Sequence, residues 1–184
     1  MTKLLDQVTI NKYANEYIRM VEEVIQKEIY VKFKLASVKL DWSTNRRSSR
    51  GGYYADGPGI NIAMASLVRE NNGEIYRVYE YKSFDSDPDI GGIYTRNKWH
   101  KLELVILHEI AHALQYYSYK VNNFRCKPHG PTWRNFYSRL RNRHLNPQLE
   151  NQPALKEEYD SMVKKVGNGF PFASSYSRAA SVSR

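Results

Sequence analysis

Two histidines and a glutamate fall close together in the segment "LHEIAHALQYY", which runs from Leu107 to Tyr117. His108 and His112 are four residues apart, so on a helix they lie one turn apart on one face and can point ring nitrogens at a single ion. Glu109 lies about 100° around the helix from His108, where it can reach a water on that ion without crowding the ion. This spacing predicts a metal site with a general base beside it.

A chance match is the alternative, in which the segment is only a buried helix that contains histidine. For five histidines in 184 residues, we estimate that the bare pattern arises by chance roughly one time in a hundred. Apolar residues that flank the pattern on a helix lower that chance further. A catalytic zinc site also needs a third protein ligand, and it leaves the fourth position to water.

The residues after His112 contain few candidates for the third metal ligand. No aspartate or glutamate occurs between Ala113 and Leu149, so a thermolysin-type carboxylate ligand has no nearby candidate. Gln115 and Ser118 occupy the positions at which a metzincin site requires glycine and histidine. Two histidines therefore remain as candidates, His129 and His144.

His129 is the preferred third ligand. It lies between Pro128 and Gly130 at the expected start of a helix, where a constrained backbone can direct one side chain back at the first helix. His144 is expected to be a solvated cation near a helix C-terminus. His100, just ahead of the metal helix, is expected to be structural or exposed.

Composition limits the class of protein. A chain of 184 residues fits one domain with appendages. No apolar run approaches the eighteen or so residues that span a bilayer, and the N-terminus lacks the apolar core of a secretory signal. We therefore expect a cytoplasmic or otherwise intracellular protein without membrane contact. The single cysteine, Cys126, excludes an intrachain disulfide and a four-cysteine zinc ribbon, so any metal must be held chiefly by histidine and carboxylate.

The net charge of +9, from 28 Lys and Arg against 19 Asp and Glu, favours polyanions or acidic surfaces as partners. Two basic clusters, interleaved with aromatic residues, predict contact with DNA, in particular single-stranded DNA. The residues expected to make this contact are Arg46, Arg47, Arg50, Lys127, Arg134, Arg139, Arg141 and Arg143. The alternative is a solvated basic face, and Trp133, Phe136 and Leu140 have the helical spacing of core residues.

The elements that must position the site follow from hydrophobic periodicity. Residues 10–30 predict an amphipathic helix. Its packed face is expected to contain Ile10, Ala14, Tyr17, Val21, Val24 and Glu28. Alternation from Phe33 to Trp42 predicts a half-buried strand. A β-hairpin follows, with a turn at residues 57–59 and its second strand at Ile60–Ala63, and residues 74–82 predict one more strand.

The metal helix is predicted from Trp99 to about Tyr119. One third of its circumference is apolar, so it should pack on that side and present its histidines on the other. The apolar residues are Leu102, Ile106, Ile110, Ala113, Leu114 and Tyr117. A second helix is expected over residues 132–144 and a further one over 149–166, before a flexible tail from Gly167. The predicted organisation is an α+β metal-site domain at 1–148 and a C-terminal extension at 149–184.

The motifs "HEIAH" and "HGPTW" together resemble the SprT-like zinc metalloprotease family, to which the DNA-dependent protease Spartan belongs. The region "RRSSRGGYYADGPGINIAMASL" is similar to the family's segment upstream of the zinc helix, so the resemblance covers roughly residues 10–145. It implies a zincin-like domain in which His108, His112 and His129 bind one catalytic Zn²⁺ and Glu109 is the catalytic acid/base. The C-terminal zinc ribbon that bacterial members commonly carry has no counterpart in this chain.

The expected activity is that of a zinc-dependent endopeptidase, in which Glu109 assists the attack of a zinc-bound water on a peptide bond. The resemblance implies DNA-associated or DNA-crosslinked proteins as substrates, and with them a location in the nucleoid or nucleus. An extended substrate is expected along an exposed sheet edge at Ile60–Ala63. The alternative is a non-enzymatic, basic nucleic-acid-binding protein with a structural zinc whose fourth ligand is His144 or Cys126.

Overall fold

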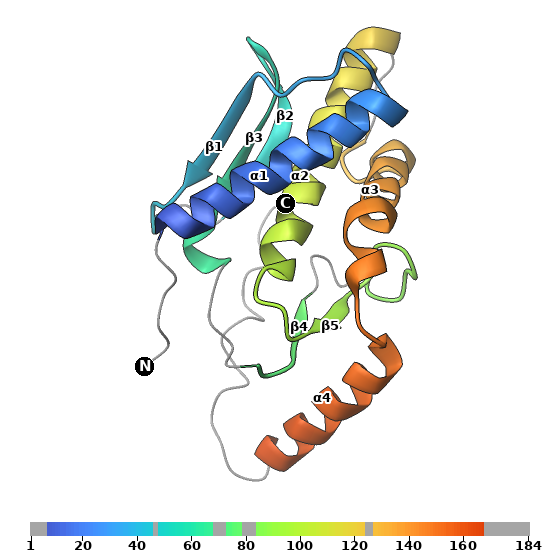
Figure 1. Ribbon diagram of the computed structural model, residues 1–184. Coiled ribbons are helices and arrows are strands. Elements are labelled where there is room, and N and C mark those ends of the chain that lie inside the picture. The colour runs from blue at the N-terminus through green and yellow to red at the C-terminus, as the bar shows by residue number, and fades with distance from the viewer. Residues whose placement is uncertain (1–6, 46–47, 68–72, 79–83, 124–126, 168–184) are drawn as a thin grey trace, which may run out of the picture.

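The computed structural model describes residues 7–45, 48–67, 73–78, 84–123 and 127–167, and it has the expected α+β composition (Figure 1). The helices of this part are α1 (Gln7–Glu28), α2 (His100–Asn122), α3 (Pro131–His144) and α4 (Gln152–Gly167), with short 3-10 turns at Met64–Ser66 and Asn146–Gln148. The strands are β1 (Ser37–Asp41), β2 (Arg50–Tyr54), β3 (Gly57–Ala63), β4 (Tyr76–Val78) and β5 (Ile93–Thr95). None of the described helices is long and apolar enough to cross a membrane.

The larger sheet has the strand order β1-β3-β2. β1 runs parallel to β3, and β2 runs antiparallel to β3. The predicted hairpin exists, but its turn lies at Ala55 and Asp56, since Tyr54 already pairs with Gly57. The expected turn at residues 57–59 is therefore wrong. Gly57 adopts a φ of +123° as it leaves the turn, a conformation that favours glycine, and the two residues after it belong to β3.

The central strand of this sheet is β3, and the predicted sheet edge at Ile60–Ala63 is therefore wrong. β3 pairs with a strand on each side, and its Ile60 and Ile62 are buried in the core. A run of apolar residues is typical of such a fully enclosed strand. Within the described chain the edge on the side of the histidines is β2, which packs against α2.

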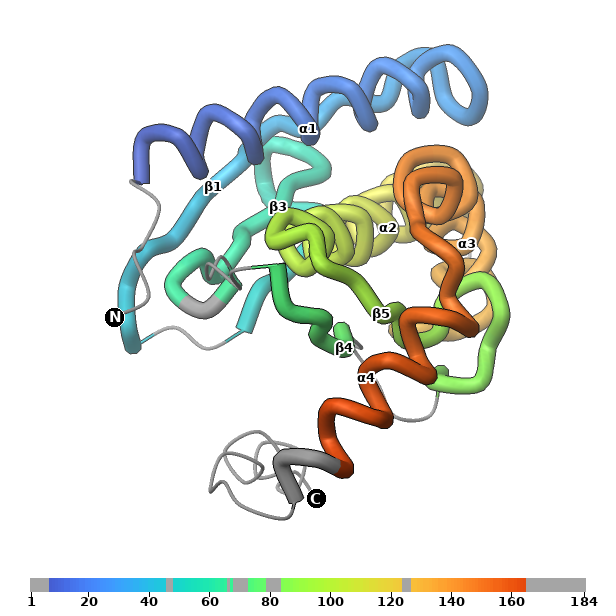
Figure 2. The backbone as a smooth tube through the Cα atoms, turned by 60° about the horizontal axis from the view of Figure 1, so that its bottom comes forward, coloured from blue at the N-terminus to red at the C-terminus, as the bar shows by residue number. Residues whose placement is uncertain are grey.

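Helix α2 passes through the centre of the molecule, with the larger sheet on one side and α3 on another, while α1 crosses above it (Figure 2). Leu104, Leu107 and Ala111 lie outside the predicted apolar stripe, yet each is at most 1% exposed. The expectation of a helix packed on one side only is therefore wrong. Because neighbours enclose α2 almost completely, His108 and His112 are themselves buried, at 7% and 8% exposed.

Helix α1 confirms the predicted N-terminal helix but differs from it at two positions. Ile18 and Ile25 are buried, whereas Val24 is only half-buried and Glu28 is exposed. Glu28 instead forms an ion pair with Arg143 of α3, with 2.9 Å between Glu28 Oε1 and Arg143 Nη2. The buried face of α1 therefore includes Ile25 and not Glu28. A charged side chain stays in water where an apolar side chain is available for the core.

Helix α4 confirms the further helix predicted over residues 149–166, and it docks on β5. Gln152 bonds to both backbone groups of Tyr94, since its Oε1 accepts from the amide at 2.8 Å and its Nε2 donates to the carbonyl at 3.0 Å. Arg96 adds ion pairs to Glu150 and Glu158, at 3.1 and 2.6 Å. The helix is thus tied to the body of the fold, and the domain boundary at residue 148 stays a prediction.

His144, at the end of α3, is buried rather than solvated. Its side chain is 5% exposed and meets the ring of Tyr17 edge-on, with 6.3 Å between centroids. Burial lowers the pKa of His144 to about 4, and the charge of Arg143 lowers it further while Glu28 opposes the change. The predicted solvated cation is therefore wrong, because the last turn of α3 faces α1. His144 is a neutral core residue.

Substitution of His144 by Phe should make the protein less sensitive to acid. In the unfolded chain His144 titrates near its ordinary pKa of 6.5, whereas in the folded protein it titrates near 4. Below pH 6.5 His144 is therefore protonated in the unfolded state but stays neutral in the folded state. The free energy of unfolding falls as the pH falls. Between pH 7 and 4.5 we expect wild type to lose on the order of 2 kcal/mol more unfolding free energy than His144→Phe. Urea unfolding at both pH values measures this difference, and equal losses would contradict it.

Candidate metal centre

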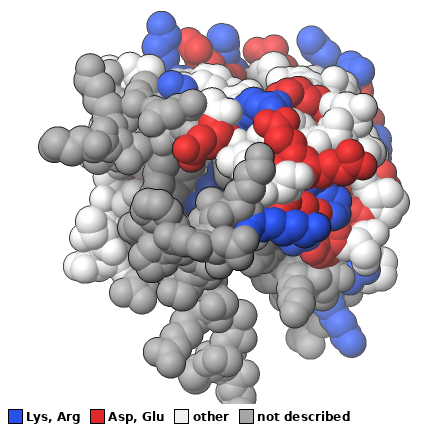
Figure 3. All heavy atoms as spheres, turned by 90° about the horizontal axis from the view of Figure 1, so that it is seen from below, with Lys and Arg blue, Asp and Glu red and all other residues white. Residues whose placement is uncertain are grey.

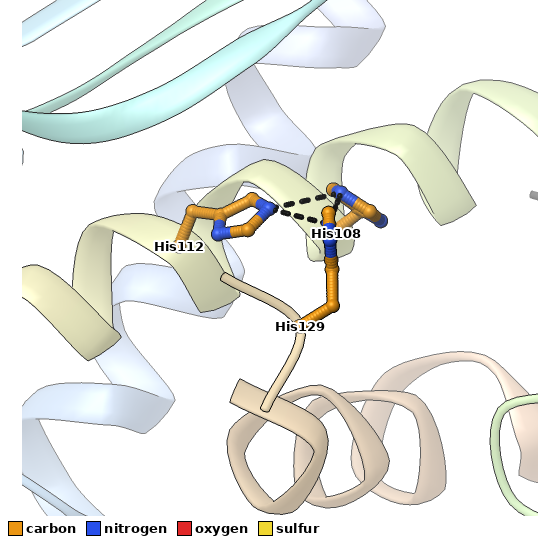
Figure 4. A group of neighbouring side chains, drawn as sticks. All are labelled: His108, His112 and His129. Carbon is orange, nitrogen blue, oxygen red and sulfur yellow. Dashed lines mark hydrogen bonds between the residues drawn. The ribbon is translucent and has the colours of Figure 1, made fainter. Parts of the chain in front are cut away.

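Three histidines from two elements converge in the structure (Figure 4). His108 and His112 project from α2, and His129 projects from the turn that precedes α3. The Nε2 atom of His112 lies 3.2 Å from that of His108 and 2.9 Å from that of His129. The third side of the triangle, between His129 and His108, is 3.2 Å. The spacing within α2 and the constrained turn thus bring together the three residues expected from the sequence.

These three nitrogens cannot satisfy one another by hydrogen bonding alone. Each Nε2 either carries a proton or presents a lone pair, so a triangle of three must contain at least one contact between two like groups. A tetrahedral zinc with Zn–N distances of about 2.0–2.1 Å separates its ligand nitrogens by about 3.3 Å, close to the observed distances. The donor set therefore fits a metal ion held by three imidazoles, and imidazole suits several transition metals besides zinc.

His129 reaches the other histidines because of its turn. The Gly130 amide donates to the Lys127 carbonyl at 3.0 Å, and His129 has a φ of +56°. A proline second and a positive φ third are typical of a type II turn, in which the third residue is usually glycine or asparagine. A histidine there costs on the order of 1 kcal/mol in backbone strain. The sequence expectation of a constrained backbone at this position is confirmed.

Trp133 forms the wall behind the three histidines. It is fully buried, as its helical spacing with Phe136 predicts. Its ring centroid lies 4.7 Å from those of both His108 and His129, and its Nε1 donates to the His108 carbonyl at 3.4 Å. An indole packed against two imidazoles restricts their rotation, so the rings are held in place by packing as well as by the backbone.

Burial keeps the rings of His112 and His129 neutral. The pKa of His112 falls to about 3, chiefly because the ring is desolvated and then because of charge on His108 and His129. The pKa of His129 falls to about 4, again by desolvation first, followed by His108 and Arg134. At neutral pH both rings therefore carry a free lone pair, which is the state that binds metal.

A cleft of about 540 Å³ opens over the histidines. Its lining comes from β2, from the loop before it, from α2 and from the His129 turn: Ser49, Arg50, Gly51, Gly52, Tyr53, Tyr54, His108, Glu109, His112, Tyr116, Pro128 and His129. Glu109 is 6% exposed and lines the same cleft as the three histidines. The carboxylate and the candidate metal ligands are thus accessible to one bound molecule.

Strand β2 rests directly on the backbone of α2 beside Glu109. A Cβ on Gly51 would lie 1.9 Å from the Glu109 carbonyl oxygen, whereas a Cβ on Gly52 would lie 3.9 Å from the Tyr116 ring. Sequence reasoning missed the contribution of these glycines and of Tyr116 to the cleft. The paired glycines were the available signal, because glycine within a strand often marks a close backbone approach.

The residues predicted to contact nucleic acid are spread over several surfaces. Arg46 and Arg47 lie outside the described residues. Arg50, Lys127, Arg134, Arg139 and Arg143 are exposed. Of these, only Arg50 lines the cleft, while the Arg134 guanidinium lies 4.5 Å from the ring centroid of Phe84. The face that carries α4, seen from below in Figure 3, mixes acidic with basic side chains, so the net charge is not gathered there.

Arg141 cannot make the predicted contact. Its side chain is 2% exposed, and its Nη1 donates to the Gly91 carbonyl at 2.8 Å. On α3 it lies one turn after Tyr137, and its guanidinium stays near that ring, 5.7 Å from the centroid. The nucleic-acid assignment of Arg141 is therefore wrong, because this residue falls on the inward face of its helix and ties α3 to the segment before β5.

Comparison with known proteins gives one match. Residues 92–154 match the model of the SprT-like family, a segment that contains β5, α2, the His129 turn, α3 and the start of α4. Comparisons with curated proteins and with solved structures found no match. The matched segment holds all three converging histidines and Glu109.

Proposed function

We propose that this chain, whose residues 92–154 match the model of the SprT-like family, is a zinc-dependent endopeptidase with a zincin-like site. The observation that carries the proposal is the convergence of three imidazole nitrogens beneath a cleft that Glu109 also lines. Among the described residues these three form the only group of histidine, cysteine or carboxylate side chains close enough to share an ion. Three protein ligands with an open fourth position are typical of a catalytic rather than a structural zinc.

The chain's own residues divide the chemistry between them. His108, His112 and His129 would hold the zinc through their Nε2 atoms. The ion, when bound, supplies a Lewis acid and a water of lowered pKa. Glu109 accepts a proton from the attacking water and passes it to the leaving amine, so that one carboxylate acts as base and then as acid. Its position on α2, one residue after His108, keeps it beside the water and out of the ligand set.

The substrate would bind as an extended strand along β2. This strand forms one edge of the described three-stranded sheet and lines the cleft along its whole length. An edge strand offers backbone donors and acceptors to an extended peptide, and the adjacent side chains then select among sequences. Tyr53 and Tyr54, 40% and 45% exposed, lie where they can contact substrate side chains.

Proteins that are bound or crosslinked to DNA are the proposed substrate class. The net charge of +9 supports this proposal, as does the position of Arg50 at the cleft and of Lys127 and Arg134 beside the His129 turn. Single-stranded DNA held by these residues would bring an attached protein to the metal centre. The alternative is a non-enzymatic nucleic-acid-binding protein with a structural zinc. One of its two candidate fourth ligands, His144, is buried elsewhere, between α3 and α1, and the other, Cys126, lies outside the described residues.

Elemental analysis combined with a cleavage assay tests the proposal. Wild type should contain one zinc per chain and His129→Ala should lose it, because two imidazoles from one helix cannot complete the site. The matched control is His144→Phe, which removes a buried histidine away from the site and should retain zinc. Cleavage of a basic protein, measured with and without single-stranded DNA, should require zinc and increase with DNA. A wild-type protein without zinc, or cleavage that survives its removal, would overturn the proposal.

A further inference from the structure

Gln115 is a buried amide that touches the loop of the third histidine. It lies on α2, three residues after His112, and is 1% exposed. Its Nε2 donates to the backbone carbonyl of Lys127 at 2.9 Å, and the same carbonyl accepts the Gly130 amide at 3.0 Å. The turn that presents His129 is therefore fastened to α2 through the carbonyl at its first residue.

The other end of this amide is buried on α2, three residues after His112. The Oε1 of Gln115 and the Nδ1 of His112 are both buried, and neither has a hydrogen-bond partner among the described residues. Side chains three residues apart on a helix are neighbours.

A metal-binding histidine needs an acceptor of this kind. To present the Nε2 lone pair to an ion, the neutral ring of His112 must carry its proton on Nδ1. That N–H is buried, and a buried donor without an acceptor costs on the order of 1–3 kcal/mol. The amide oxygen of Gln115 is the available acceptor, while the amide nitrogen is already committed to Lys127.

We propose that Gln115 is a positioning residue that couples two of the metal ligands: its Oε1 accepts the Nδ1 proton of His112, and its Nε2 holds the turn that carries His129. One side chain then fixes the tautomer of one ligand and the location of another. This inference rests on the metal site of the proposed function, but it requires no peptide-bond cleavage. If Gln115 merely filled space, an apolar residue of similar size would serve equally well.

Two substitutions separate the two ends of the amide. Gln115→Glu keeps an acceptor for His112 and removes the donor to Lys127. Gln115→Met keeps the approximate size and removes both. Ser118→Ala is the matched control. It also removes side-chain hydrogen bonds of a buried residue on α2, between Ser118 Oγ and Tyr30 Oη at 2.9 Å and from Asn122 Nδ2 to Ser118 Oγ at 3.3 Å, and Ser118 does not line the cleft.

The first readout is the histidine tautomer, measured by ¹⁵N NMR of the imidazole rings in metal-free protein at pH 7. His112 should be protonated on Nδ1 in wild type, in Gln115→Glu and in Ser118→Ala. In Gln115→Met it should become a mixture of both tautomers. Since this measurement needs neither zinc nor a substrate, its outcome is independent of whether the protein cleaves peptide bonds.

The second readout is the zinc dissociation constant, measured by competition with a chromophoric chelator. Gln115→Met should bind zinc about 10- to 100-fold more weakly than wild type, the usual effect of removing such a partner. Gln115→Glu should fall between the two, and Ser118→Ala should match wild type. An Nε2-protonated His112 in metal-free wild type would overturn the inference even if Gln115→Met fails to fold. So would a Gln115→Met protein whose tautomer and zinc affinity equal those of Ser118→Ala.

Discussion

Glu109→Gln is expected to retain zinc and the fold while peptide-bond cleavage falls by about 10²- to 10⁴-fold, the usual contribution of a general base. The glutamine side chain has nearly the same shape as glutamate, so the packing of α2 against β2 is preserved. An amide, however, cannot accept the proton of the attacking water. Because Glu109 is not expected to be a ligand, zinc content should stay at the wild-type value.

The matched control is Glu103→Gln, a second glutamate-to-glutamine change on α2. Glu103 is 1% exposed, is hydrogen-bonded by Tyr13 and does not line the cleft. Burial raises the pKa of Glu103 because it opposes the charge on the carboxylate, so a neutral glutamine should be tolerated there and cleavage should persist. Initial rates on one protein substrate, with zinc content measured on the same samples, give the comparison. Retained cleavage in Glu109→Gln, or an equal loss in both variants, would refute the assigned mechanism.

The three histidines could be predicted from the sequence because their geometry is local. His108 and His112 are related by the period of one helix, which holds whatever surrounds it. His129 depends on a turn in which the preceding proline, Pro128, has a fixed φ. In both cases a few adjacent residues determine where the side chains point, and the structure brings them within 3.2 Å of one another.

The walls of the site could not be predicted in the same way, because they depend on contacts between segments far apart in the chain. Whether β2 or β3 forms the edge of the sheet depends on β1, which inserts beside β3 in parallel. The depth at which α2 is buried depends on the sheet, α1 and α3 together. Periodicity within one segment reports which of its faces is apolar, but not how many neighbours will cover it.

His144 and Arg141 show the same limit for charged residues. Both come from the basic sequence "RLRNRH" near the end of α3, whose composition suggests a solvated surface. In the structure both are at most 5% exposed, because α3 lies against α1 and against the segment that contains Gly91. Composition predicts the average exposure of such residues, whereas the fold selects the individual ones that are enclosed.

Gly51→Ala is expected both to destabilise the protein and to reduce its peptide-bond cleavage. The new Cβ would lie 1.9 Å from the Glu109 carbonyl oxygen, and a backbone group cannot move aside as a flexible side chain can. Strand β2 would therefore have to shift away from α2. Forcing extra volume into a packed contact typically costs about 1–3 kcal/mol. The shift would also move the substrate-binding edge away from Glu109, so cleavage should fall in protein that is still folded and still contains zinc.

Gly52→Ala isolates this contact from the general effect of replacing glycine. Both glycines lie in β2, and neither has a positive φ, so alanine fits the backbone equally well at the two positions. At Gly52, however, the added carbon would meet the Tyr116 ring at 3.9 Å, an ordinary van der Waals distance. We therefore expect Gly52→Ala to stay near wild type in both urea unfolding and cleavage rate. If Gly51→Ala and Gly52→Ala had equal stability and equal cleavage rates, the close contact between β2 and the Glu109 backbone would be contradicted, and β2 would not be the wall of the cleft.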